Sequence, residues 1–166
     1  MNASELAAPV RRQAPGTAPK TAIVLGSGLG SLADEVVDAT RLSFLDLPGF
    51  PRSGVSGHAG ELVLGRLAGQ PVAVLSGRAH YYEHGNPREM ALPIATLAAL
   101  GVERLILTNA AGSLREDMPP GTPMLITDHV NWSGLNPLIG VEGDARFVSM
   151  VDAYDPALLD LARRAA

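Results

Sequence analysis

A glycine-rich turn follows the first apolar run of the chain and is the first segment whose residues could bind an anion. The run over 21–25 (TAIVL) is typical of a buried parallel strand, and the turn over 26–30 (GSGLG) follows it directly. Glycines let the backbone approach a ligand closely, the N–H groups of a short helix over 31–37 would point at an anion, and Ser27 adds a hydroxyl donor. The turn matches neither the dinucleotide fingerprint nor a P-loop. A tight strand-to-helix turn without a ligand is equally open.

A second polar segment, over 76–85 (SGRAHYYEHG), directly follows another buried strand. Ligands of α/β proteins bind at this edge of the sheet, outside the carboxyl ends of the strands. Arg78 and His80 are two residues apart, so in an extended loop they point the same way and could clamp a phosphate together. Tyr82 continues the same alternation and could pack on a sugar. The alternative is a surface loop with solvated charges.

Two further segments have residue types that suit a ligand site. Small residues over 108–113 (TNAAGS) lie at a strand end and leave room for a ligand against the backbone, although a tight turn chosen for packing is equally open. His58 stands between glycines in GHAG, where a structural or exposed histidine is the more common case.

The remaining histidines do not indicate a metal or an acid/base pair. A metal site at His80 and His84 would need a helix, and the glycines around them indicate a loop, so we expect no metal. Asp128 and His129 are adjacent, and on a strand they would face opposite ways.

Strand-like and helix-like segments alternate from residue 21 onward, which predicts an α/β fold. We expect strands over 21–25, 62–67, 71–75, 104–108 and 124–127. The second and third are separated by a hairpin signal, so the predicted central sheet is mixed, with helices flanking it. Asn86-Pro87 predicts a helix start, with an end at Gly101. Pro93 should either kink this helix or start a second segment. A last helix begins at Pro156, and the region over 128–146 is rich in loops.

Composition excludes several classes of protein. A net charge of −4 argues against a general nucleic-acid binder, and the absence of cysteine removes disulfides and thiolate chemistry and suits the cytoplasm. We expect no membrane span, because no apolar run is long enough for one. Residues 1–20 lack the apolar core of a signal peptide and are predicted to form a flexible N-terminal arm.

Taken together, the motifs resemble those of the purine nucleoside phosphorylases of the trimeric type. Six stretches carry the resemblance, in order and with similar gaps: LGSGLGSLAD (25–34), FPRSGVSGHAGELVLG (50–65), SGRAHYYE (76–83), TNAAGSL (108–114), LITDHVNWSGLNPLIG (125–140) and DARFVSMVDAYD (144–155). The resemblance implies that residues 21–166 are the N-terminal portion of a single phosphorylase domain. The chain would then be truncated, since the family's purine-binding residues lie beyond those present here.

The resemblance also implies roles for particular residues. The implied phosphate ligands are Ser27, His58, Arg78, His80 and the backbone N–H of Ala110, with His80 as the catalytic residue among them. The implied ribose contacts are Tyr82 and Phe147, the latter reaching into the site of a neighbouring subunit.

The implied activity is phosphate-dependent cleavage of 6-oxopurine nucleosides to the free base and ribose 1-phosphate. The resemblance further implies a cytoplasmic homotrimer that uses no cofactor, with inorganic phosphate as co-substrate. The alternatives are a truncated, inactive product and a phosphate-binding subunit that does not catalyse alone. A generic nucleotide-binding α/β domain is disfavoured because its signatures fail.

Overall fold

The computed structural model describes residues 2–52 and 59–165. It divides into two compact units, Met1–Ala111 and Gly112–Ala166, and each is described by itself. The assignment of 21–166 to a single domain therefore stays a prediction.

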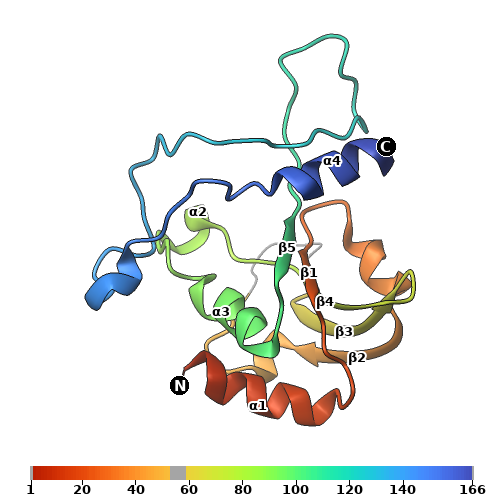
Figure 1. The fold of residues 1–166 in the computed structure, drawn as a ribbon, viewed down its shortest axis with the longest axis vertical. Coiled ribbons are helices and arrows are strands. Elements are labelled where there is room, and N and C mark those ends of the chain that lie inside the picture. The colour runs from red at the N-terminus through yellow and green to blue at the C-terminus, as the bar shows by residue number, and fades with distance from the viewer. Residues whose placement is uncertain (1, 53–58, 166) are drawn as a thin grey trace. The chain divides into compact units, whose positions relative to one another are not determined.

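The first unit contains a mixed sheet of five strands in the order β2-β3-β4-β1-β5 (Figure 1). The strands are β1 (Thr21–Val24), β2 (Val37–Ser43), β3 (Glu61–Leu67), β4 (Gln70–Ser76) and β5 (Arg104–Leu107). β1 pairs in parallel with both β4 and β5, whereas β2, β3 and β4 are antiparallel neighbours. The predicted mixed α/β sheet is confirmed, including the hairpin between β3 and β4. β2 was not predicted, and it begins with a register shift and has Asp38 at a φ of 52°.

The helices of this unit are α1 (Ala3–Gln13), α2 (Tyr81–His84) and α3 (Ala91–Leu100), with 3₁₀ turns at Gly30–Glu35 and Phe44–Asp46. α3 ends at Gly101, which has a φ of 103°, as predicted. It begins at Ala91, later than the predicted start at Asn86, so Pro93 lies in its first turn, where proline is tolerated. This fits the alternative of a separate segment starting near Pro93 rather than a kink inside a longer helix.

The segment predicted as a flexible N-terminal arm contains the helix α1 in the described residues. α1 starts with a capping box, in which Asn2 Oδ1 accepts from the Glu5 N–H (3.0 Å) and Glu5 Oε2 accepts from the Asn2 N–H (2.9 Å). Leu6 and Val10 are 1% and 0% exposed, and α1 packs against α3 (Figure 1). Leu6 and Val10, which are one helical turn apart, thus give α1 a buried face, although the average composition of the helix is polar.

The core lies on both faces of the sheet because successive strand residues point to opposite sides. Ala22 and Val24 of β1 pack in the cluster that α1 and α3 cover. Ile23 and Leu25 pack in a second cluster, together with Ala33 of the turn Gly30–Glu35. β1 is therefore held on both faces, which gives the turn that follows it a rigid support.

The second unit has a 3₁₀ turn at Gly143–Arg146 and the helix α4 (Pro156–Ala165). The strand predicted over 124–127 is wrong: these residues pair with no strand in the described part of the chain, and Met124 is 61% exposed. An apolar run becomes a strand only where a neighbour accepts its backbone hydrogen bonds.

Candidate functional site

Three turns meet at one edge of the sheet because β4, β1 and β5 are adjacent and parallel. The glycine-rich turn follows β1, the Arg78–His80 segment follows β4, and the turn with Ala110 follows β5. The carboxyl ends of parallel strands are the usual place for ligands in α/β sheets. The structure thus brings three of the predicted segments to one place.

Thr108 connects these three turns through hydrogen bonds. Its Oγ1 accepts from the Gly26 N–H (2.8 Å) and donates to the Val24 carbonyl oxygen (3.1 Å). Its own carbonyl oxygen accepts a hydrogen bond from Nη1 of Arg78. The half-buried Arg78 guanidinium is therefore held beside the residue that also fixes the start of the glycine-rich turn.

The glycine-rich turn depends on glycine at position 26. A Cβ there would lie 2.7 Å from the Thr108 carbonyl oxygen, which is part of the backbone and has little room to move. Gly28 has a φ of 86°, in the left-handed region that favours glycine. Between these two residues, Ser27 is exposed, so its hydroxyl is accessible to a ligand.

Arg41, in β2, holds the 3₁₀ turn Gly30–Glu35 that follows the glycine-rich turn. Its Nη2 donates to the Ala33 carbonyl oxygen (2.9 Å) and to Asp34 Oδ1 (2.8 Å), and its Nη1 donates to Glu61 Oε2 (3.1 Å). Hydrogen bonding to Glu61 raises the pKa of the Arg41 guanidinium above its ordinary value; burial opposes this shift, and the hydrogen bond to Asp34 adds to it. The 3₁₀ turn after Gly28-Leu29 is thereby tied to β2 and β3.

His80 is held by a carboxylate at the start of α2. Glu83 Oε1 accepts from the His80 backbone N–H (2.7 Å) and lies 3.0 Å from His80 Nδ1. The Glu83 side chain is 10% exposed and that of His80 is 19% exposed. The Tyr82 ring stacks on the imidazole, with centroids 4.9 Å apart and planes 18° apart. Tyr82 is 74% exposed, so one face of its ring is accessible.

The segment over 76–85 differs from the expected loop, because Tyr81–His84 form the short helix α2. The argument against a metal that relied on a loop is therefore wrong. Each imidazole instead has a carboxylate beside its Nδ1, Glu83 for His80 and, at 2.7 Å, Glu89 for His84. In the described ranges, no group of three or more histidine, aspartate and glutamate side chains is placed to hold a metal ion.

The other predicted residues are not all part of this edge of the sheet. His58 lies outside the described residues. Phe147 belongs to the second unit, where it is 75% exposed and has the Arg146 guanidinium 5.3 Å from its ring centroid. The ligand-binding roles assigned to Ser27, Arg78, His80 and Ala110 stay predictions. Thr108 and Glu83 lie in predicted segments, but neither was assigned a role there. The signal for Glu83 was its position three residues after His80, which is the spacing of a capping box.

Asp128 and His129 have local partners in the second unit, although they lie on no strand. The His129 backbone N–H donates to Asp128 Oδ1 (2.8 Å), and His129 Nδ1 lies 3.0 Å from the Tyr154 hydroxyl. The pair therefore provides no acid/base arrangement of its own.

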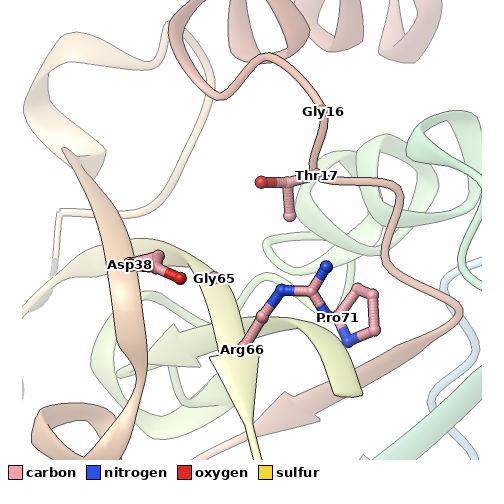
Figure 2. A pocket seen from close by; sticks show the side chains of 6 residues that line it. All are labelled: Gly16, Thr17, Asp38, Gly65, Arg66 and Pro71. Atoms are coloured by element: carbon pink, nitrogen blue, oxygen red, sulfur yellow. The ribbon is translucent and has the colours of Figure 1, made fainter. Parts of the chain in front are cut away.

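A small hollow of about 50 Å³ lies elsewhere in the first unit (Figure 2). Gly16, Thr17, Asp38, Gly65, Arg66 and Pro71 line it. Pro71 is near the start of β4, so the hollow is at the opposite end of that strand from Arg78. Arg66 donates to the Gly69 carbonyl oxygen of its own hairpin (3.0 Å). As for membranes, none of the helices in the described residues is long and apolar enough to cross one.

Curated relatives match nearly all of this chain. Purine nucleoside phosphorylase 1 of Geobacillus stearothermophilus is 46% identical over 167 residues, covering 99% of this chain and 61% of the relative. Purine nucleoside phosphorylase 1 of Bacillus subtilis is 47% identical, covering 98% and 61%. The chain thus spans about three fifths of the length of these relatives.

Solved structures of purine nucleoside phosphorylases are also similar to this chain. Isoform 2 of purine nucleoside phosphorylase from Schistosoma mansoni, in complex with cytosine and ribose-1-phosphate, has a TM-score of 0.86 and 38% identity. The match covers 97% of this chain and 58% of that one. A Schistosoma mansoni purine nucleoside phosphorylase in complex with inosine has a TM-score of 0.85 and 35% identity, with the same coverage. The fold is therefore that of a portion of these enzymes, somewhat under three fifths of their length.

The family model described as "Phosphorylase superfamily" matches residues 20–166, which include β1, β4 and β5 and the three turns that follow them. With relatives above 40% identity and solved structures of the same fold, this match shows that the chain belongs to the phosphorylase superfamily.

Proposed function

We propose that the chain carries the phosphate and ribose part of a purine nucleoside phosphorylase site. The observation that carries the proposal is the connection of Arg78 and the glycine-rich turn through Thr108 at the carboxyl ends of three parallel strands. The similarity to enzymes named purine nucleoside phosphorylase, and to a structure that holds ribose-1-phosphate, supports this ligand class.

In this proposal the phosphate is held by Arg78, His80, the Ser27 hydroxyl and the Ala110 N–H, with His58 beside it. An arginine fork and several N–H and O–H donors suit a phosphate, because each of its oxygens can accept more than one hydrogen bond. His80 is the catalytic residue of the set, oriented by Glu83. Tyr82 lines the ribose, and Phe147 contacts the ribose of a neighbouring subunit in a homotrimer.

The reaction is phosphorolysis of a 6-oxopurine nucleoside. A phosphate oxygen forms a bond to the anomeric carbon while the bond from that carbon to the purine nitrogen breaks. The purine leaves with the bonding electron pair and takes up a proton, and ribose 1-phosphate remains. As in glycoside cleavage, positive charge develops on the sugar, and a fixed phosphate dianion beneath it offsets that charge. Holding the phosphate in place also makes its attack effectively unimolecular. Inorganic phosphate is a co-substrate, and the chemistry needs no cofactor.

A second candidate is a phosphate-binding subunit that does not catalyse alone. The coverage of 61% of the relatives favours it, and the family resemblance implies that the purine is held by residues other than those of this chain. Losing a single contact that stabilises the transition state typically costs about 10²–10³ in rate. We therefore propose that residues 1–166 bind phosphate without useful turnover, and that they act in the cytoplasm.

The test uses purified residues 1–166, freed of host phosphorylase. Equilibrium dialysis with radioactive orthophosphate measures phosphate binding, and chromatography measures hypoxanthine formed from inosine and phosphate. We expect saturable phosphate binding and negligible hypoxanthine. A folded preparation that binds no phosphate would contradict the phosphate site. Robust turnover would contradict the proposal that these residues do not form a complete purine site.

A further inference from the structure

Thr108 differs from the proposed phosphate ligands because its polar atoms face the protein. The residue directly follows β5 and is half-buried, although the preceding Leu107 is 66% exposed. Its hydroxyl and its backbone N–H both donate to the Val24 carbonyl oxygen, each at 3.1 Å. These two bonds hold Thr108 against the end of β1.

The hydroxyl oxygen of Thr108 then acts on the glycine-rich turn. It accepts the Gly26 N–H at 2.8 Å, and Gly26 directly precedes Ser27. Gly26 has no room for a Cβ beside the Thr108 carbonyl, so the two backbones are in close contact. The position of Ser27 therefore depends on one side-chain hydroxyl that lies 82 residues away in the sequence.

The carbonyl oxygen of Thr108 contacts the segment that follows β4. It accepts from Nη1 of Arg78, which follows β4. An arginine has five N–H donors in a fixed fork, so one bond to a carbonyl sets the plane of the guanidinium and leaves other donors for an anion. Two residues after Thr108, Ala110 presents the backbone N–H assigned to the same anion.

We propose that Thr108 is the positioning residue of the phosphate site, setting the distance between the Ser27 turn and the Arg78 guanidinium without contacting phosphate itself. The inference rests on the proposed function, because it assigns a residue to the site proposed above. Threonine suits this task better than serine because its β-branch restricts χ1 and keeps the hydroxyl directed at Gly26.

The test compares Thr108→Val with Thr108→Ser in the 166-residue chain. Valine keeps the shape and removes the hydroxyl, which leaves the Gly26 N–H unpaired; serine keeps the hydroxyl. Thr96→Val is the control, since Thr96 is buried and its hydroxyl likewise donates to a backbone carbonyl, that of Leu92 (2.8 Å), in α3. Dialysis with radioactive orthophosphate gives the Kd, and thermal unfolding checks the fold of each variant.

We expect Thr108→Val to weaken phosphate binding by about five- to a hundredfold, the usual effect of leaving a polar group unpaired. Thr108→Ser should recover most of the affinity, and Thr96→Val should leave the Kd unchanged even if it lowers Tm. Amide exchange of Gly26, followed by NMR, should become faster in Thr108→Val and stay slow in Thr96→Val. If Thr108 had only a structural role, Thr108→Val would lower Tm, but its phosphate Kd would stay unchanged, as expected for Thr96→Val.

The outcomes separate the inference from the proposed function. If the wild-type chain binds phosphate and a folded Thr108→Val binds it equally well, the positioning inference is overturned and the phosphate site stands. If the wild-type chain binds no phosphate, the proposed function fails and the inference fails with it. If Thr108→Val does not fold, Thr108→Ala replaces it, and an unchanged Kd in that variant overturns the inference.

Discussion

The Glu83 carboxylate contacts His80 at two points, the backbone N–H at 2.7 Å and Nδ1 of the ring at 3.0 Å. One nearly buried side chain therefore fixes both the start of α2 and the orientation of the imidazole. In the proposed phosphate site, Nδ1 is thus the ring nitrogen that faces the carboxylate rather than the anion.

Replacing Glu83 by Gln should weaken phosphate binding by about tenfold, because a charge-assisted hydrogen bond to the imidazole is lost. The measurement is the phosphate Kd. Glu89→Gln is the matched control, since Glu89 pairs with His84 at 2.7 Å and His84 has no proposed part in the site. A gain in affinity on Glu83→Gln would mean that repulsion between this carboxylate and the anion outweighs its effect on His80.

Arg78→Ala should weaken phosphate binding far more than nucleoside binding. A lost charge-assisted contact at a half-buried position costs on the order of 1.5–3 kcal/mol, about ten- to a hundredfold in affinity. Arg66→Ala is a suitable control, because Arg66 also donates to a backbone carbonyl but lies in the β3–β4 hairpin. Titrations with phosphate and with inosine separate the two ligands, and an unchanged phosphate affinity would remove Arg78 from the site.

Phe147 should act across a subunit boundary. In an oligomer, Phe147→Ala chains and Arg78→Ala chains should each bind ribose 1-phosphate weakly alone, and mixing them should restore a fraction of intact sites. The physical reason is that each intact site takes Arg78 from one chain and Phe147 from the next. A contact of this kind is heterologous and closes naturally into a ring such as a trimer. Proven mixing without any recovery would mean that the two residues do not share a site.

Leu6→Ala should destabilise the first unit by about 2–5 kcal/mol, the usual cost of truncating a buried leucine. Leu6 is 1% exposed in the contact between α1 and the sheet core. Leu45→Ala, at a leucine that is 72% exposed, should change the free energy of unfolding by less than about 0.5 kcal/mol. Urea unfolding measures both. Equal, small effects would show that the N-terminal helix is not held to the core in solution.

Local pattern was sufficient for most of the sheet. The apolar runs over 21–25, 62–67, 71–75 and 104–108 correspond to β1, β3, β4 and β5 within a residue or so at each end. The runs of β1, β3 and β4 are predictable because a buried strand must be apolar on the faces it presents to the core. The run of β5 is also apolar and was expected to be buried, but its four residues are exposed in the structure. β2 escaped prediction since its sequence, VDATRLS, is mostly polar and it lies at the edge of the sheet.

Segments whose structure depends on partners were predicted less well. α1 is polar on average, and only its packing on α3 and the sheet makes it a fixed element. The run over 124–127 has the composition of a strand but has no pairing neighbour in the described residues. In both cases the outcome was decided by contacts distant in sequence, which local propensity does not contain.

The sequence by itself determined the chemistry available at the candidate site: the glycine-rich turn with Ser27, the Arg78 and His80 pair, and the small residues around Ala110, each directly after an apolar run that predicts a strand. Only the tertiary structure decided that these segments meet, because the order β4-β1-β5 places three strand ends side by side. The role of Thr108 follows from that order alone. Its bonds to Gly26 and Arg78 span 82 and 30 residues, and contacts of such separation form only when parallel strands pair in register.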